Sequence, residues 1–246
     1  RLLFLRKIMS RQPVQNFFDG LPPTGRITKW FCIATVVISL IGSQTQMRLG
    51  LGIDNLVFNV DAVLNLELWR LITYPFAYHQ PFGLVIGVFV FWLFGKLYEK
   101  RWGENNFFKF IALSGIGAAG LAIPLSYLVD FFLPFKDYGT AEGAGPIIDA
   151  ILIHMAIMEP NSKILAGFVL PIRTKTLVFC ILGFDIVTGL MTGAAGLSTT
   201  LGGIVMGYLL TTGNWRPTRI KAEWDVRTSP KRRNLYVVKP PDQTLH

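Results

Sequence analysis

The chain has 246 residues, of which 24 are Lys or Arg and 15 are Asp or Glu, so its formal net charge is +9. Only 16% of the residues are charged, whereas 51% are hydrophobic and 13% are aromatic. An average soluble domain has about 25% charged residues, so the composition argues against a conventional soluble enzyme. The apolar content also excludes an intrinsically disordered chain. The two cysteines, Cys32 and Cys180, lie in apolar runs and indicate neither a disulfide framework nor a cysteine metal site.

Six apolar segments predict six membrane-spanning helices, because about 20 mostly apolar residues are needed to cross a bilayer. Pro124 lies inside the third segment and predicts a kink or a break there. A further apolar run, residues 164–172, is too short to span and predicts an interfacial return before the fifth helix. The fold class predicted is therefore an all-α membrane protein with a six-helix bundle. In chain order, the six segments are residues 30–42, 82–98, 107–133, 139–158, 177–191 and 196–213.

The basic residues lie almost entirely on one side of these segments. Of the 24 lysines and arginines, 21 fall before the first helix, in the region where helix two ends and helix three begins, between helices four and five, or after the sixth. The other three are Arg48, Arg70 and Lys136. Because positive charge collects on the cytosolic side of membrane proteins, both termini are predicted to be cytosolic, or in the matrix of a mitochondrion. Anionic headgroups suffice as partners for these charges, so no nucleic-acid partner is expected.

Three regions follow from this arrangement. Residues 1–29 form a basic N-terminal segment, residues 30–213 the membrane domain, and residues 214–246 a basic tail with four prolines. The tail is expected to be extended and to dock on a partner or on headgroups. The charge pattern does not distinguish a bacterial inner membrane, a mitochondrial inner membrane and an endomembrane.

Three ionisable side chains lie deepest in the predicted spans: Asp149, His154 and Asp185. Such groups are costly in hydrocarbon and face the protein interior or water. They have two interpretations, a proton or ion path, or hydrogen bonds between helices to hydroxyl groups such as those of residues 198–200. The absence of a repeat pattern favours the second, and the carboxyl group of Asp149 is predicted to bond the sixth helix.

Glycines predict a close contact between the fourth and sixth helices. Gly203 and Gly207 are four residues apart, so they share one helix face and allow close approach of another backbone. Gly196 extends that face, and Gly143 and Gly145 are the matching candidates on the fourth helix. The alternative for any one of them is an unpaired membrane glycine.

Several motifs in this order resemble the rhomboid superfamily over about residues 28–213. They are the pair Trp69-Arg70 within LWRLITYPFAY, the run FWLFGKLYEKRWG at 91–103, EGAGPI at 142–147 and TLGGIVMG at 200–207. Active rhomboids are intramembrane serine proteases with a serine on helix four and a histidine base on helix six. A histidine and an asparagine on helix two support the oxyanion.

The resemblance implies that the catalytic positions are degenerate in this chain. The nucleophile position falls at Ala144 and the base position at Thr200, while the helix-two positions fall at Gly83 and Gly87. A serine–histidine pair needs a hydroxyl activated by an adjacent base, which neither alanine nor threonine supplies. A relocated pair of Ser198 and His154 is the remaining alternative.

The predicted function is therefore that of a rhomboid-like pseudoprotease, as in inactive rhomboids and derlins. The resemblance implies non-catalytic binding of other membrane proteins, either as an assembly or quality-control factor or as a subunit of a larger membrane complex. Its expected partners are the lipid bilayer and other membrane proteins, with no cofactor and no metal. Two alternatives remain: an atypical rhomboid protease, and a protein that translocates protons or a solute.

Overall fold

Six long helices, one β-hairpin and a folded first loop make up the part of the chain described by a computed structural model, residues 23–49, 52–133, 135, 138–160, 163–166 and 170–213. The chain divides into a unit ending at Thr211 and a second unit, Thr212–His246, of which only the first two residues are described. The predicted N-terminal segment up to residue 22 and the tail from residue 214 lie outside the described residues. The long helices are α3 (Arg26–Leu49), α6 (Pro81–Trp102), α7 (Glu104–Phe132), α8 (Gly145–Met158), α9 (Thr174–Thr192) and α10 (Ala194–Thr212).

Within the described ranges, five of these helices are long and apolar enough to cross a membrane, and α8 has 14 residues. This confirms an all-α membrane bundle. Helices α3, α6 and α9 extend beyond the predicted apolar segments at both ends, whereas α7 and α10 begin earlier and end one residue earlier than predicted. The predicted break at Pro124 is wrong: the residue lies inside α7, which runs on to Phe132. Proline has no backbone N–H, so α7 loses one helical hydrogen bond at Pro124. Packing against the neighbouring helices lets α7 continue despite this loss.

The fourth predicted segment is only partly helical. Residues up to Ala144 are not helical, and α8 begins at Gly145, with Pro146 in its first turn. Ala141 instead pairs with Phe58 through two backbone hydrogen bonds of 2.9 Å each. Proline at the start of a helix is favourable because it has no N–H to leave unpaired. The fourth helix is therefore short and begins inside the bundle.

The first loop is itself folded into four short helical elements, and a β-hairpin joins α8 to α9. The hairpin pairs β1 (Lys163–Ala166) antiparallel with β2 (Leu170–Arg173). It lies where the interfacial return was predicted, and its paired strands were not foreseen. The elements of the first loop are η1 (Ile53–Asn55), α4 (Val60–Leu64), α5 (Arg70–Thr73) and η2 (Tyr74–Phe76).

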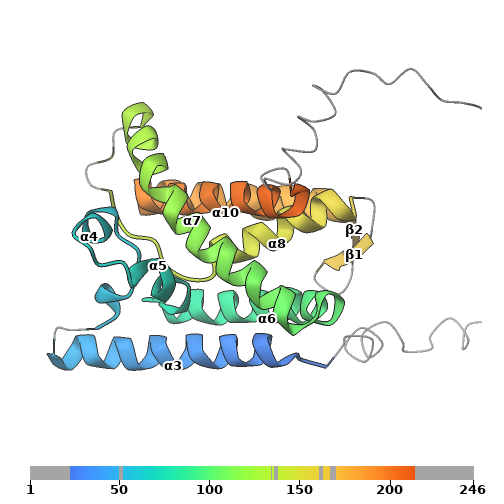
Figure 1. Cartoon of the computed structure of the whole chain (residues 1–246), viewed down its shortest axis with the longest axis horizontal. Helices are drawn as coiled ribbons and strands as arrows, with labels where there is room; N and C mark the ends of the chain where they lie inside the picture. The colour runs from blue at the N-terminus through green and yellow to red at the C-terminus, as the bar shows by residue number, and fades with distance from the viewer. Residues whose placement is uncertain are drawn as a thin grey trace, which may run out of the picture. The chain divides into compact units, whose positions relative to one another are not determined.

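Side-chain contacts define which helix termini share an end of the bundle. Glu99, near the end of α6, binds the start of α3, and Arg101 pairs with Glu159 just after α8. His154 of α8 lies beside Thr211 near the end of α10. Figure 1 shows the hairpin at this end, with α4 and α5 of the first loop at the other. We call the first the basic end, because it carries Lys29, Lys100, Arg101, Lys109, Arg173 and Lys175.

The largest core cluster lies between α6, α7 and α8. Phe91 of α6, Phe107 of α7 and Ile151 of α8 are fully buried in it. Helix α8 therefore lies in the interior, surrounded by the spanning helices (Figure 1). The backbone just before α8, at the end opposite the basic end, is where the candidate site is found.

Candidate functional site

The structure brings together three of the four positions that the rhomboid resemblance assigns to catalysis. Gly83 and Gly87 lie in the first two turns of α6. Ala144 immediately precedes α8 and is 1% exposed. Both α6 glycines and Ala144 adjoin the side chain of Tyr78. Thr200 is a buried residue of α10, on the helix that packs against α7 and α8.

Tyr78 fills the space between α6 and the segment before α8. Its hydroxyl oxygen accepts a hydrogen bond of 2.9 Å from the N–H of Ala144. A Cβ at Gly87 would lie 2.7 Å from the ring carbon Cζ, and a Cβ at Gly143 would lie 2.5 Å from the ring. Gly143 also has φ +82°, a conformation that favours glycine. The two glycines thus make room for one aromatic ring.

Tyr78 fills this pocket and also brings no reactive group into it. Burial raises the pKa of Tyr78 to about 12, against the smaller opposite effect of the Ala144 N–H bond. The phenol is therefore neutral at ordinary pH and is neither a nucleophile nor a base. The space left beside the ring has no room for a water molecule. It is lined by Phe31, Cys32, Thr35, Tyr78, Gly87, Val88, Phe91 and Ala144.

We expect Gly87→Ala to destabilise the chain by about 1–3 kcal/mol, because the new methyl group overlaps the Tyr78 ring. Most of this loss should disappear in the background of Tyr78→Ala, since that change removes the overlapped atoms. Unfolding of the purified protein in mixed micelles measures the cycle. Gly83→Ala is the matched control, because its Cβ meets Tyr78 at an ordinary 3.6 Å. An equal cost of Gly87→Ala with and without the tyrosine would contradict the assignment.

The pair Trp69-Arg70 organises the first loop that carries Tyr78. The buried Arg70 guanidinium donates from Nη1 to the carbonyl oxygens of Asp54 at 2.5 Å and Val57 at 2.9 Å, and from Nε to Glu67. The Trp69 indole donates to the carbonyl oxygen of Asn55 at 3.1 Å. These bonds satisfy the η1 carbonyls and tie η1 to α5. Trp69 and Arg70 therefore hold the first loop in its folded shape.

The helix-packing glycines divide into two groups. A Cβ at Gly203 would lie 2.7 Å from the Pro146 Cα, and one at Gly207 would lie 2.7 Å from the Ala150 Cα, so α10 meets α8 backbone to backbone. The predicted part of the other three glycines in the contact between the fourth and sixth helices is wrong. Gly143 packs on Tyr78 rather than on α10, Gly145 has open space at its Cβ position, and Gly196 packs on α9. On α8 the contact is made by Pro146 and Ala150, which follow the predicted Gly143 and Gly145 in the chain.

Asp149 and Asp185 are neighbours, one on α8 and one on α9. Asp149 is fully buried, and neither of its carboxyl oxygens has a hydrogen-bond partner among the described residues. The predicted bond from Asp149 to α10 is therefore wrong.

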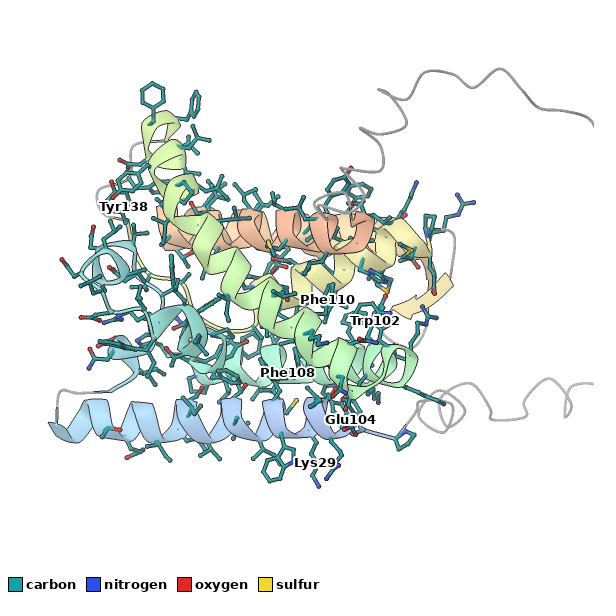
Figure 2. All side chains as sticks on the ribbon, viewed as in Figure 1. Lys29, Trp102, Glu104, Phe108, Phe110 and Tyr138 are labelled. Atoms are coloured by element: carbon teal, nitrogen blue, oxygen red, sulfur yellow. The ribbon has the colours of Figure 1, made fainter. Side chains whose placement is uncertain are left out.

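His154 lies apart from these carboxyls, in an aromatic cluster near the basic end. Its ring stacks edge-on against Trp102 at 4.6 Å between centroids and lies 6.1 Å from Phe110. Trp102 and Phe110 lie 4.9 Å apart between ring centroids, and Figure 2 shows both beside α7. His154 Nδ1 lies 3.0 Å from the Thr211 hydroxyl. Ser198 lies roughly 20 Å from Thr211 along α10, so Ser198 and His154 do not form a catalytic pair.

Two further contacts were missed from the sequence. His79, next to Tyr78, lies between the carboxylates of Asp54 and Glu142. Glu99 is 3% exposed and accepts bonds from the start of α3. Both look like ordinary surface charges in the sequence, because their partners lie 25 to 72 residues away. Among the described residues, no group of three or more His, Cys, Asp or Glu is placed to hold a metal ion.

A comparison with protein families matches residues 29–211 to the family described as "Eukaryotic integral membrane protein (DUF1751)". The match runs from the first turn of α3 to the last turn of α10, and so includes nearly all of the membrane bundle, the first loop and the Tyr78 pocket. The apolar helices and the matched region agree on the class of protein. The chain therefore belongs to this family of eukaryotic integral membrane proteins.

Proposed function

We propose that the chain is a rhomboid-like membrane scaffold without protease activity, which binds other membrane proteins in assembly or quality control, or as a subunit of a larger complex. The observation that carries the proposal is the Tyr78 ring, which fills the space between Gly87 and Ala144 where a peptide bond would have to be attacked. A protease needs that space open and lined with reactive groups.

The residues at the four degenerate positions support this interpretation. Ala144 has no nucleophilic atom, and the Thr200 hydroxyl is no base near neutral pH. Gly83 and Gly87 have no side chains that could donate to an oxyanion. All four positions therefore lack the side chains that proteolysis needs. The Tyr78 ring also occupies space that only a glycine at position 87 leaves open. Together these features argue against protease activity.

Binding of membrane proteins is supported by the lateral surfaces of the bundle. Helix α9 leaves Phe179, Phe184 and Met191 more than 65% exposed, so its outer face is available to lipid or to a partner helix. Its eukaryotic family and the distribution of basic residues favour an organelle or endomembrane with both termini on the cytosolic or matrix side.

The test combines an activity probe with native purification. The chain is expected to show no labelling by a serine-directed fluorophosphonate and no cleavage of a model transmembrane substrate. The double variant Ala144→Ser, Thr200→His is expected to stay inactive, because Tyr78 still fills the pocket. Membrane proteins should co-purify in fixed ratio if the chain is a subunit, or as many transient clients if it acts in quality control. Labelling of the unmodified chain that disappears in Ser198→Ala would overturn the proposal.

A further inference from the structure

Two adjacent residues, Tyr78 and His79, point to opposite sides of the short connection between η2 and α6. Tyr78 occupies the pocket beside Ala144. His79 faces two carboxylates, one in η1 of the first loop and one in the segment before α8. The connection thus joins three parts of the fold at one point.

Both ring nitrogens of His79 face an acceptor. Nε2 lies 2.7 Å from the Asp54 Oδ1 atom, and Nδ1 bonds Glu142 Oε2. The backbone N–H of His79 donates to the same Glu142 oxygen at 3.2 Å. A neutral imidazole has only one N–H, so its other nitrogen would turn a lone pair toward a carboxylate. Only the imidazolium donates to both.

We propose that protonated His79 is a latch that holds Tyr78 in its pocket, and that loss of the proton releases the connection and opens the space beside Ala144. Glu142 precedes Gly143 and Ala144, so the carboxylate that binds His79 also positions the backbone that binds Tyr78. The charged groups facing His79 among the described residues are Asp54 and Glu142, with the Arg70 guanidinium close by on the Asp54 carbonyl.

The direction of the response follows from the same contacts. Partial burial alone lowers the pKa of His79, but the hydrogen bonds and charges of Glu142 and Asp54 outweigh it and raise the pKa above its ordinary value. A raised pKa in the folded state means that the latch stabilises the fold fully below the ordinary pKa of histidine. Its contribution is lost as the pH rises through the raised value. The pocket should therefore be closed at acidic pH and open at alkaline pH.

Amide hydrogen exchange at single-residue resolution tests the latch in the full-length chain. The Ala144 N–H donates to Tyr78, whereas the N–H of Ile151, a fully buried residue inside α8, serves as the internal reference. Between about pH 6 and about pH 9, the protection of Ala144 relative to Ile151 should fall about tenfold or more, after correction for intrinsic exchange. His79→Gln should abolish the pH dependence and leave Ala144 weakly protected throughout.

Two further variants separate the latch from general destabilisation. Glu142→Gln removes one facing carboxylate and should shift the loss of protection to lower pH. His154→Gln removes a histidine of the distant aromatic cluster and should keep the pH profile of the unmodified chain. A flat profile in the unmodified chain, or a profile that persists in His79→Gln, would overturn the proposal. Neither outcome depends on whether the chain is a protease.

Discussion

Replacing Gly203 by valine should lower the free energy of unfolding by about 3 kcal/mol or more, because α10 and α8 are in contact through their backbones there. A Cβ at Gly203 would overlap the Pro146 carbonyl oxygen and lie 2.7 Å from the Pro146 Cα. Overpacking a well-packed interior costs about 1–3 kcal/mol, and more where the neighbour is backbone, which has no alternative rotamer. The two helices must separate, and α8 is the short helix on which the Tyr78 pocket is built.

Gly120→Val is the matched control for this substitution. Gly120 lies inside α7, and a Cβ there would have nothing within 4 Å, so the change in helix propensity is the same without the overlap. Unfolding in mixed micelles of increasing denaturing detergent gives the difference in free energy. The close contact of Gly203 with Pro146 is supported if the free energy of unfolding of Gly203→Ala lies between those of the native chain and Gly203→Val. Equal losses at both glycines would show that the α8–α10 contact contributes nothing.

The sequence predicts the spanning helices well, because burial in a bilayer requires long apolar segments and their ends carry charge. It predicts the start of α8 poorly. The run from Gly139 to Met158 is mostly apolar, although it includes Glu142, Asp149 and His154, and a continuous helix is the natural interpretation. The helix begins late because Ala141 pairs with Phe58, a partner in the first loop that no local pattern reveals.

The candidate site shows the same limit. The sequence alone suffices to propose Ala144 and Thr200 as degenerate positions, since they stand in the motifs that resemble the rhomboid superfamily, and this assignment stays a prediction. The tyrosine that fills the pocket could not, because its relation to Gly87 and Gly143 depends on how the first loop folds back. A tyrosine and two glycines indicate a filled pocket only when Tyr78, Gly87 and Gly143 are known to be in contact.

Glu99 carries the other large expected effect, since it joins α3 to α6 at the basic end. Its carboxylate accepts hydrogen bonds from the N–H groups of Ile27 and Thr28 at 2.8 Å each, and from the Thr28 hydroxyl at 2.7 Å. These two N–H groups lie in the first turn of α3, where no helical carbonyl precedes them. A buried negative charge at a helix N-terminus also interacts favourably with the helix dipole.

Glu99→Gln should therefore destabilise the chain by about 3 kcal/mol, because hydrogen bonds to a charged acceptor contribute about 1.5–3 kcal/mol each and their losses are not additive. The amide keeps the size of the side chain but turns a donor toward the donors of α3. Glu104→Gln, at the exposed start of α7, is the matched control and should change stability by less than about 0.5 kcal/mol. Hydrogen exchange should locate the effect, with faster exchange at Ile27 and Thr28 well before global unfolding. If those two amides keep their protection in Glu99→Gln, the carboxylate does not hold α3 in place, and other contacts between α3 and α6, such as the stacking of Phe31 on Phe91, join the two helices.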